Sequence, residues 1–247
     1  MPALRPRLLT ILALLCCCYC SSALAQVLPL RIGSWDRDSD PLTAVSEAVL
    51  SRAYAELGQP LEFVALPNRR ALQALLAGEL DGNLHRVRDV ATTHPGLLRV
   101  APPINASAVR IYTYDAKLAQ PQDWAQLQGL RVAYQRGVLR IEQMLPAGAR
   151  RVEAGSVNEL FRLLDAGIAD LALCTEPDQA PPLRRLGKLR RLEQALEEHL
   201  LYHYLSGRHV ELVPRLAAVL QKLQASGELD AIRQAALQAY MRQHPVD

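Results

Sequence analysis

The sequence predicts an α/β fold of two lobes, each a mostly parallel sheet flanked by helices, with two hinge strands crossing between them. Three observations support this fold class. Short apolar segments alternate with segments of helical period in two separate blocks, which is typical of parallel sheets. Both blocks contain a helix that ends at a glycine and is followed by an aspartate opening a strand. Two extended segments without helical period lie outside these blocks. The glycine–aspartate pairs are Gly78 with Asp81 and Gly167 with Asp170.

The individual elements follow from apolar spacing and from glycine stop signals. In the first block we expect strands at 28–34, 61–66 and 80–84, and helices at 43–57 and 69–77. In the second block we expect strands at 130–134, 151–153 and 169–173, and helices at 139–145 and 157–166. The crossing strands are expected at 104–114 and 200–206, and two amphipathic helices at 211–240 with a break at Ser226-Gly227.

Residues 1–25 have the pattern of a secretory signal peptide. Arg5 and Arg7 precede an apolar run, and Ala23-Leu24-Ala25 supplies small residues before a cleavage site at Gln26. The run is shorter than the ~20 residues of a membrane-spanning helix, and an uncleaved anchor is the alternative. Cleavage leaves Cys174 as the single cysteine, so no internal disulfide is expected. The sequence therefore predicts an exported protein, periplasmic in a cell with two membranes.

Composition and motifs exclude several classes of function. Half of the residues are hydrophobic, and 28 Lys and Arg against 25 Asp and Glu leave a net charge of +3, too even for a nucleic-acid binder. The basic stretch 184–191 lacks interleaved aromatic residues and is interpreted as a solvated surface. His199 and His203 could share a helix face, but no zinc-protease glutamate accompanies them. We expect no metal, no cofactor and no catalytic residue.

Several segments, in order, resemble the periplasmic solute-binding proteins of the polar amino-acid type, family 3, which have the type II periplasmic-binding fold. The segments are 30–33, 69–82, 127–137, 166–172, 216–220 and 225–229. The resemblance covers the whole chain after residue 25. It implies that lobe one spans 26–108, lobe two 109–204, and that 205–247 return to lobe one. It also implies a monomer that closes around an amino acid or related carboxylate and delivers it to an ABC importer.

In this family an arginine of lobe one binds the ligand carboxylate, within a Thr-Pro-Glu-Arg segment after the Gly-x-x-Asp strand. Here that segment is absent, and the chain runs from Asn83 to Arg88 instead. Arg86 is the candidate for the role, since guanidinium pairs with carboxylate in a bidentate manner. The resemblance also implies that Trp35 packs on the ligand, and Arg70 begins a helix close to the expected cleft.

The resemblance implies a second set of ligand contacts in lobe two. Arg136, Gly137 and Val138 lie between a strand and a helix, where free backbone N–H groups suit an anion, although Val138 replaces the hydroxyl residue of the family. The position of the aspartate that pairs with the ligand ammonium holds Thr175, with Glu176 next. Either residue could read the second polar group, or the ligand has no ammonium.

Two alternatives of other classes stay open. The protein could sense a ligand for a membrane receptor instead of feeding a transporter. It could also be a periplasmic dehydratase-like enzyme acting on small cyclic carboxylates, with Glu176 and His85 as acid and base.

Overall fold

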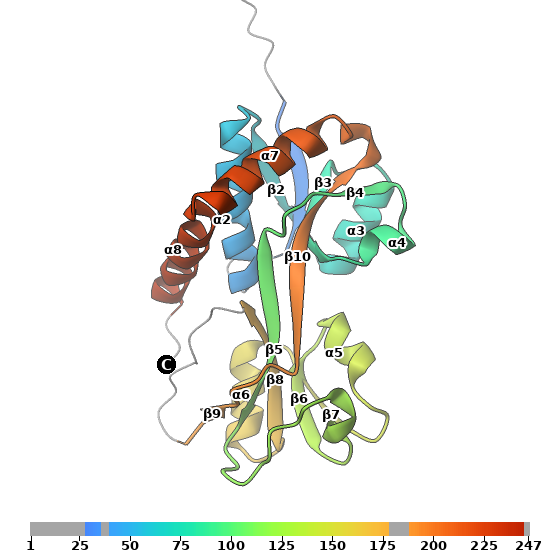
Figure 1. The fold of residues 1–247 in the computed structure, drawn as a ribbon. Coiled ribbons are helices and arrows are strands. Elements are labelled where there is room, and N and C mark those ends of the chain that lie inside the picture. The colour runs from blue at the N-terminus through green and yellow to red at the C-terminus, as the bar shows by residue number, and fades with distance from the viewer. Residues whose placement is uncertain (1–27, 36–39, 178–187, 245–247) are drawn as a thin grey trace, which may run out of the picture.

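The computed structural model describes residues 28–35, 40–177 and 188–244 (Figure 1). The predicted signal peptide, residues 36–39 and the first half of the basic stretch 184–191 lie outside these residues. Within the described part, no helix is long and apolar enough to cross a membrane.

Lobe one is built on three parallel strands in the order β2-β1-β3. These strands are β1 (Leu30–Ser34), β2 (Leu61–Ala65) and β3 (Gly82–Val87). The helices α2 (Pro41–Glu56), α7 (Leu212–Ala225) and α8 (Glu228–Gln243) cover one face, and α3 (Asn68–Leu76) and α4 (Val90–Thr93) lie on the other side (Figure 1). Asp40 caps α2 by accepting the Leu42 and Thr43 N–H groups, which starts this helix slightly before the predicted position.

Lobe two repeats the arrangement in the order β8-β6-β7. The strands are β6 (Arg131–Gln135), β7 (Arg150–Ala154) and β8 (Leu171–Pro177). The helices α5 (Leu139–Met144) and α6 (Val157–Asp165) pack on opposite faces of this sheet, and η1 (Trp124–Leu127) precedes β6. The α5 face buries Val109, Tyr134 and Ile141, whereas the α6 face buries Tyr112 and Phe161.

Two long antiparallel strands join the lobes, β5 (Asn105–Thr113) and β10 (Glu197–Ser206). β10 pairs with β3 and with β4 (Leu97–Arg99) of lobe one, while β5 pairs with β8 and with β9 (Arg190–Arg191) of lobe two. All described strands thus belong to one sheet that runs through both lobes. Figure 1 shows β5 and β10 side by side where the chain passes between the lobes. The predicted crossing strands are confirmed.

The repeated glycine–aspartate pattern has the same structural basis in both lobes. Gly78 and Gly167 follow the last residues of α3 and α6 with φ of +78° and +65°, a conformation that glycine adopts without strain. The Asp81 carboxylate accepts the backbone N–H of Arg31 at 2.8 Å. The Asp170 carboxylate accepts the backbone N–H of Arg131 at 2.7 Å. The aspartate therefore joins the strand it precedes to the neighbouring parallel strand.

Two predicted strand boundaries are wrong in a way that affects the site. β8 was expected to end at residue 173 but continues through Pro177, because its last residues pair with β5. β10 was expected to begin at residue 200 but begins at Glu197, also through pairing with β5. Thr175 and Glu176 are consequently strand residues instead of loop residues. His199 and His203 lie on this strand and not on a helix.

Candidate ligand-binding site

The carboxyl ends of the parallel strands in the two lobes approach each other. Trp35 follows β1, and Asn68 opens α3 after β2, while Gly137 follows β6 in lobe two. A methyl group placed on Gly137 would lie 4.0 Å from Cη2 of Trp35. Residues from both lobes thus meet at this edge, which is where open α/β sheets hold their ligands.

Arg86 lies at this edge, near the end of β3 and beneath the first turn of α3. Its Nε donates to Oδ1 of Asn83 at 3.1 Å, and its guanidinium also donates to the carbonyl of Asn68. Both acceptors are neutral. Among the residues that the structure describes, no carboxylate forms an ion pair with Arg86. Burial lowers the pKa of this guanidinium to about 10, so the group stays charged at neutral pH.

The residue before Arg86 belongs to a separate hydrogen-bonded network with α2 and β5. His85, the preceding residue, contacts Oγ of Ser46 through Nδ1 at 2.9 Å, and the Asn105 amide donates to the same oxygen at 3.0 Å. Burial, with smaller contributions from Arg86 and His203, lowers the pKa of His85 to about 3. The imidazole is therefore neutral and adds no charge beside Arg86.

The other predicted arginines have different surroundings. Arg70 lies in the first turn of α3 and is exposed. Arg136 is exposed and pairs with Glu153 of β7 at 3.0 Å. Trp35 is half-buried.

The turn after β6 already holds an anion from the protein. The backbone N–H of Gly137 donates to Oε1 of Glu142, on α5, at 2.8 Å. This donor was expected to be free for a ligand carboxylate, and in the structure it is not. Val138 packs against the lobe-two core on the α5 side and supplies no side-chain donor.

Thr175 and Glu176 project from opposite faces of β8, because side chains alternate along a strand. Glu176 is buried on the α6 face, where it accepts the Tyr112 hydroxyl at 2.9 Å and lies 3.3 Å from Nη1 of Arg191. Burial raises the pKa of Glu176, and the bonds from Tyr112 and Arg191 work against that rise. Thr175 faces the α5 side. The expected pair thus separates, and Thr175 alone shares a face with α5.

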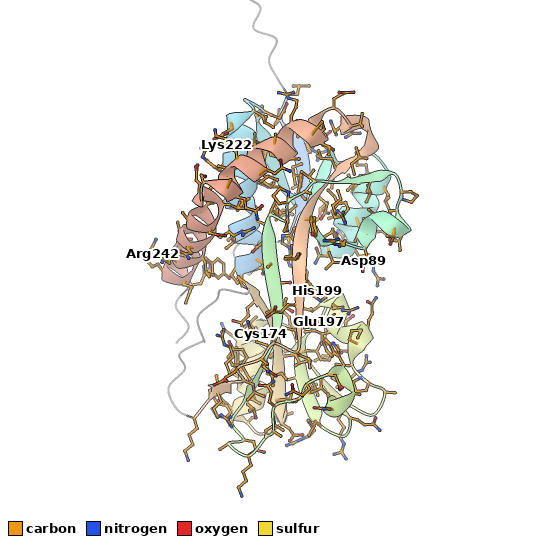
Figure 2. All side chains as sticks on the ribbon, in the orientation of Figure 1. Asp89, Cys174, Glu197, His199, Lys222 and Arg242 are labelled. Atoms are coloured by element: carbon orange, nitrogen blue, oxygen red, sulfur yellow. The ribbon has the colours of Figure 1, made fainter. Side chains whose placement is uncertain are left out.

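Sequence analysis missed a cluster at the start of β10. Nε of Arg140, on α5, lies 3.0 Å from both carboxylate oxygens of Glu197, and Nε2 of His199 lies 3.3 Å from Oε1 of the same residue. Figure 2 shows Glu197 and His199 at the level where β10 passes between the lobes. Burial disfavours ionisation of Glu197, but Arg140 and His199 outweigh it and lower its pKa. Residues 197–201 are Glu-Glu-His-Leu-Leu, which do not alternate polar and apolar side chains, so no local sequence signal marks this strand.

Other side chains with possible catalytic or metal-binding roles do not come together in the described part of the chain. A depression of about 570 Å³ lies elsewhere on lobe two, lined by residues 118–122 and 190–194. Within the described ranges, no group of three or more His, Cys, Asp and Glu could hold a metal ion. Cys174 is buried beside Glu176, and its burial raises the thiol pKa. His85 bonds to Ser46 and Glu176 to Tyr112, so these residues do not form an acid–base pair.

Comparisons with known proteins concern the fold of the chain. No family model matches the chain. An uncharacterized protein of Shewanella oneidensis is 26% identical over 200 residues, which cover 77% of this chain and 75% of that protein. The solved structures with similar folds are more informative.

The ligand-binding core of GluR0, solved with L-glutamate, has a TM-score of 0.69 at 17% identity, covering 86% of this chain and 99% of that one. The amino acid ABC transporter substrate-binding protein AbpA from Streptococcus pneumoniae, bound to L-arginine, has a TM-score of 0.66 at 18% identity, covering 86% and 95%. A histidine kinase sensor domain similar to periplasmic binding proteins has a TM-score of 0.64 at 21% identity, covering 86% and 97%. The chain has the two-lobed type II periplasmic-binding fold.

Proposed function

We propose that this protein is an exported solute-binding protein that holds a small carboxylate between its two lobes. The observation that carries the proposal is Arg86. A guanidinium that is largely removed from water needs a negative partner, and the described part of the chain provides none. A ligand carboxylate is a suitable partner, because it matches the two parallel donors of the guanidinium.

Closure of the lobes completes the site. Trp35 of lobe one lies against the Gly137 turn of lobe two, so a ligand on Arg86 would be covered from both sides. The two crossing strands β5 and β10 are the hinge about which such closure occurs. The protein would then deliver the bound ligand to an ABC importer. This role is supported by the fold neighbours that are substrate-binding proteins of ABC transporters.

Substitution of Arg86 tests the proposal. Arg86→Gln keeps a hydrogen-bonding side chain and removes the charge. A charged hydrogen bond contributes about 1.5–3 kcal/mol, so we expect carboxylate affinity to fall roughly 10- to 100-fold in calorimetric titration. Arg88→Gln is the matched control, because Arg88 is exposed and its guanidinium bonds to the Tyr202 hydroxyl instead. Equal losses in both variants would contradict the role of Arg86.

A sensing role is the second candidate, favoured by the sensor domain among the fold neighbours. The ligand site would be the same, and only the partner differs. Deleting the protein from cells that make it separates the two roles. Delivery predicts that uptake of the labelled ligand is lost, whereas sensing predicts intact uptake and an altered transcriptional response to the ligand.

A further inference from the structure

Polar side chains gather where β8, β5 and β10 lie side by side, on the face of the hinge that carries α5. We call Thr175, Glu197 and His199 the floor of the hinge. Thr175 of β8 and Glu197 of β10 both lie in register with Val109 of β5, so the three side chains leave the same face. His199 lies two residues further along β10, opposite Ser107, and leaves that face as well. Arg140 confirms the direction, because it reaches Glu197 from α5.

Two polar atoms of this floor are buried and unsatisfied. Oγ1 of Thr175 has no hydrogen-bond partner among the described residues, and Nε2 of His199 has none with hydrogen-bond geometry, although it lies 3.3 Å from Oε1 of Glu197. Buried polar atoms are nearly always hydrogen-bonded, and an exception needs an explanation. Both atoms can donate or accept, depending on hydroxyl rotation and on the imidazole tautomer. A ligand group that can do either would satisfy them.

The acidic groups around this floor are already engaged. The carboxylate of Glu197 is held by Arg140 through both oxygens. Glu176 is on the opposite face, bonded to Tyr112 and Arg191. A ligand ammonium, which carries three donors and a charge, would find no free carboxylate in this cluster. Glu197 lies 3.3 Å from Nε2 of His199 without a hydrogen bond to it, so this nitrogen stays available to a ligand group.

We propose that Thr175 and His199 bind an uncharged hydroxyl or carbonyl group of the ligand, so that the ligand class is a small hydroxy or oxo acid instead of an amino acid. This inference rests on the proposed function, in which Arg86 binds the ligand carboxylate. It assigns the second polar contact to the hinge strands, with Thr175 and not Glu176 as the contact from β8.

Matched ligand series test the inference on the purified protein after refolding to remove carried ligand. The probes are three-, four- and five-carbon acids, each as the hydroxy, oxo, amino and unsubstituted compound: for example L-malate, oxaloacetate, L-aspartate and succinate. Calorimetric titration should show that in one series a hydroxy or oxo acid binds at least 10-fold more tightly than the amino and unsubstituted acids. This comparison needs no variant and is unaffected by folding defects.

Two variants then locate the contact. Thr175→Val, which keeps the side-chain shape, and His199→Phe should each weaken binding of the hydroxy or oxo acid at least 10-fold and that of the unsubstituted acid less than 2-fold. Glu198→Gln is the control, because its side chain leaves the opposite face and is 67% exposed. It should change neither affinity.

The outcomes separate the two proposals. Tightest binding of an amino acid, equal binding of substituted and unsubstituted acids, or equal losses for both acids in Thr175→Val would overturn the inference and leave the proposed function intact. Binding of no carboxylate by the wild-type protein would overturn both.

Discussion

His203 lies at the centre of lobe one and is completely buried. Its Nδ1 lies 2.9 Å from the Asn83 carbonyl and 3.2 Å from the Leu84 carbonyl, both of which only accept, so Nδ1 carries the proton. Nε2 is then an acceptor, and the Tyr54 hydroxyl donates to it at 2.9 Å. The neutral imidazole is fully satisfied, and a second proton would have no place in this arrangement.

This histidine makes the stability of the fold depend on pH. Burial lowers the pKa of His203 to about 4, whereas an unfolded histidine has a pKa of about 6.5. Above pH 6.5 neither state binds the proton. Between pH 6.5 and 4 the unfolded state binds it and the folded state does not, so the free energy of unfolding falls as the pH falls. His203 alone contributes on the order of 2 kcal/mol to the loss from pH 7 to pH 5, and His85, whose pKa is also lowered, adds to it.

Urea unfolding at the two pH values measures this difference. His203→Gln retains hydrogen-bonding groups but cannot be protonated, so its loss between pH 7 and pH 5 should be smaller than that of the wild type by about the same amount. An unchanged pH dependence in the variant would show that other groups cause it.

At the scale of elements, the sequence predicted the parallel strands and the helices that flank them, because each has a clear local signal. The short elements α4, β4, η1 and β9 were not predicted. α2, α3, α6, α7 and α8 all have apolar spacing of helical period and a glycine near their ends. The strands of the parallel sheets are short apolar runs, and the fold class is confirmed. The site residues Trp35, Arg86 and Thr175 were named because the resemblance to the solute-binding family implies ligand contacts at or near these positions, close to the ends of such strands.

The errors concern strand segments whose conformation depends on distant partners. Glu197, Glu198 and His199 are too polar to be predicted as a strand, and only pairing with β5 makes them one. The same pairing extends β8 past residue 173, which sends Thr175 and Glu176 to opposite faces. Gly137 was expected to have a free N–H, but Glu142, one turn of helix away, occupies it. No local pattern contains this information.

The glycine–aspartate repeat gives a prediction at this scale. Each carboxylate makes three hydrogen bonds, Asp170 with Arg131 alone and Asp81 with Arg31, Arg208 and His209. The Asp81 side chain is the less exposed of the two, 17% against 32%, and it also joins β3 to the residues beyond the end of β10. A hydrogen bond to a charged group contributes about 1.5–3 kcal/mol to stability. Part of this loss is offset when the freed partners form hydrogen bonds to water instead. We therefore expect Asp81→Ala to destabilise the protein more than Asp170→Ala, with losses of about 2–3 and 1–2 kcal/mol.

Urea unfolding of the two variants, compared at pH 7, measures this order. The two sites serve as each other's control, since both aspartates precede a strand and follow a glycine by the same interval. The reverse order, or two equal losses, would mean that the lower exposure of Asp81 and its contacts at the junction of β3 and β10 do not add to stability.

At the scale of the whole molecule, the single sheet couples the lobes. β5 and β10 pair with each other over Asn105–Val109 and Glu197–Leu201, and each continues into the sheet of a different lobe. A change of angle between the lobes must therefore occur within these two strands, close to Thr175, Glu197 and His199. A ligand that bonds to the floor of the hinge and to Arg86 would contact both the moving lobe and the hinge.

Trp35 provides a direct measurement of this closure. The chain has two tryptophans, and Trp124 lies in η1, where it packs against the lobe-two core. Trp124→Phe thus leaves Trp35 as the only tryptophan, next to the Gly137 turn of the opposite lobe. Because closure changes the contact of the indole with lobe two and with water, titration with a bound carboxylate should shift its emission saturably, with the Kd found by calorimetry. In Trp35→Phe the emission of Trp124 should stay constant. A ligand-dependent signal from Trp124 with none from Trp35 would contradict closure at this edge, and would place the conformational change inside lobe two.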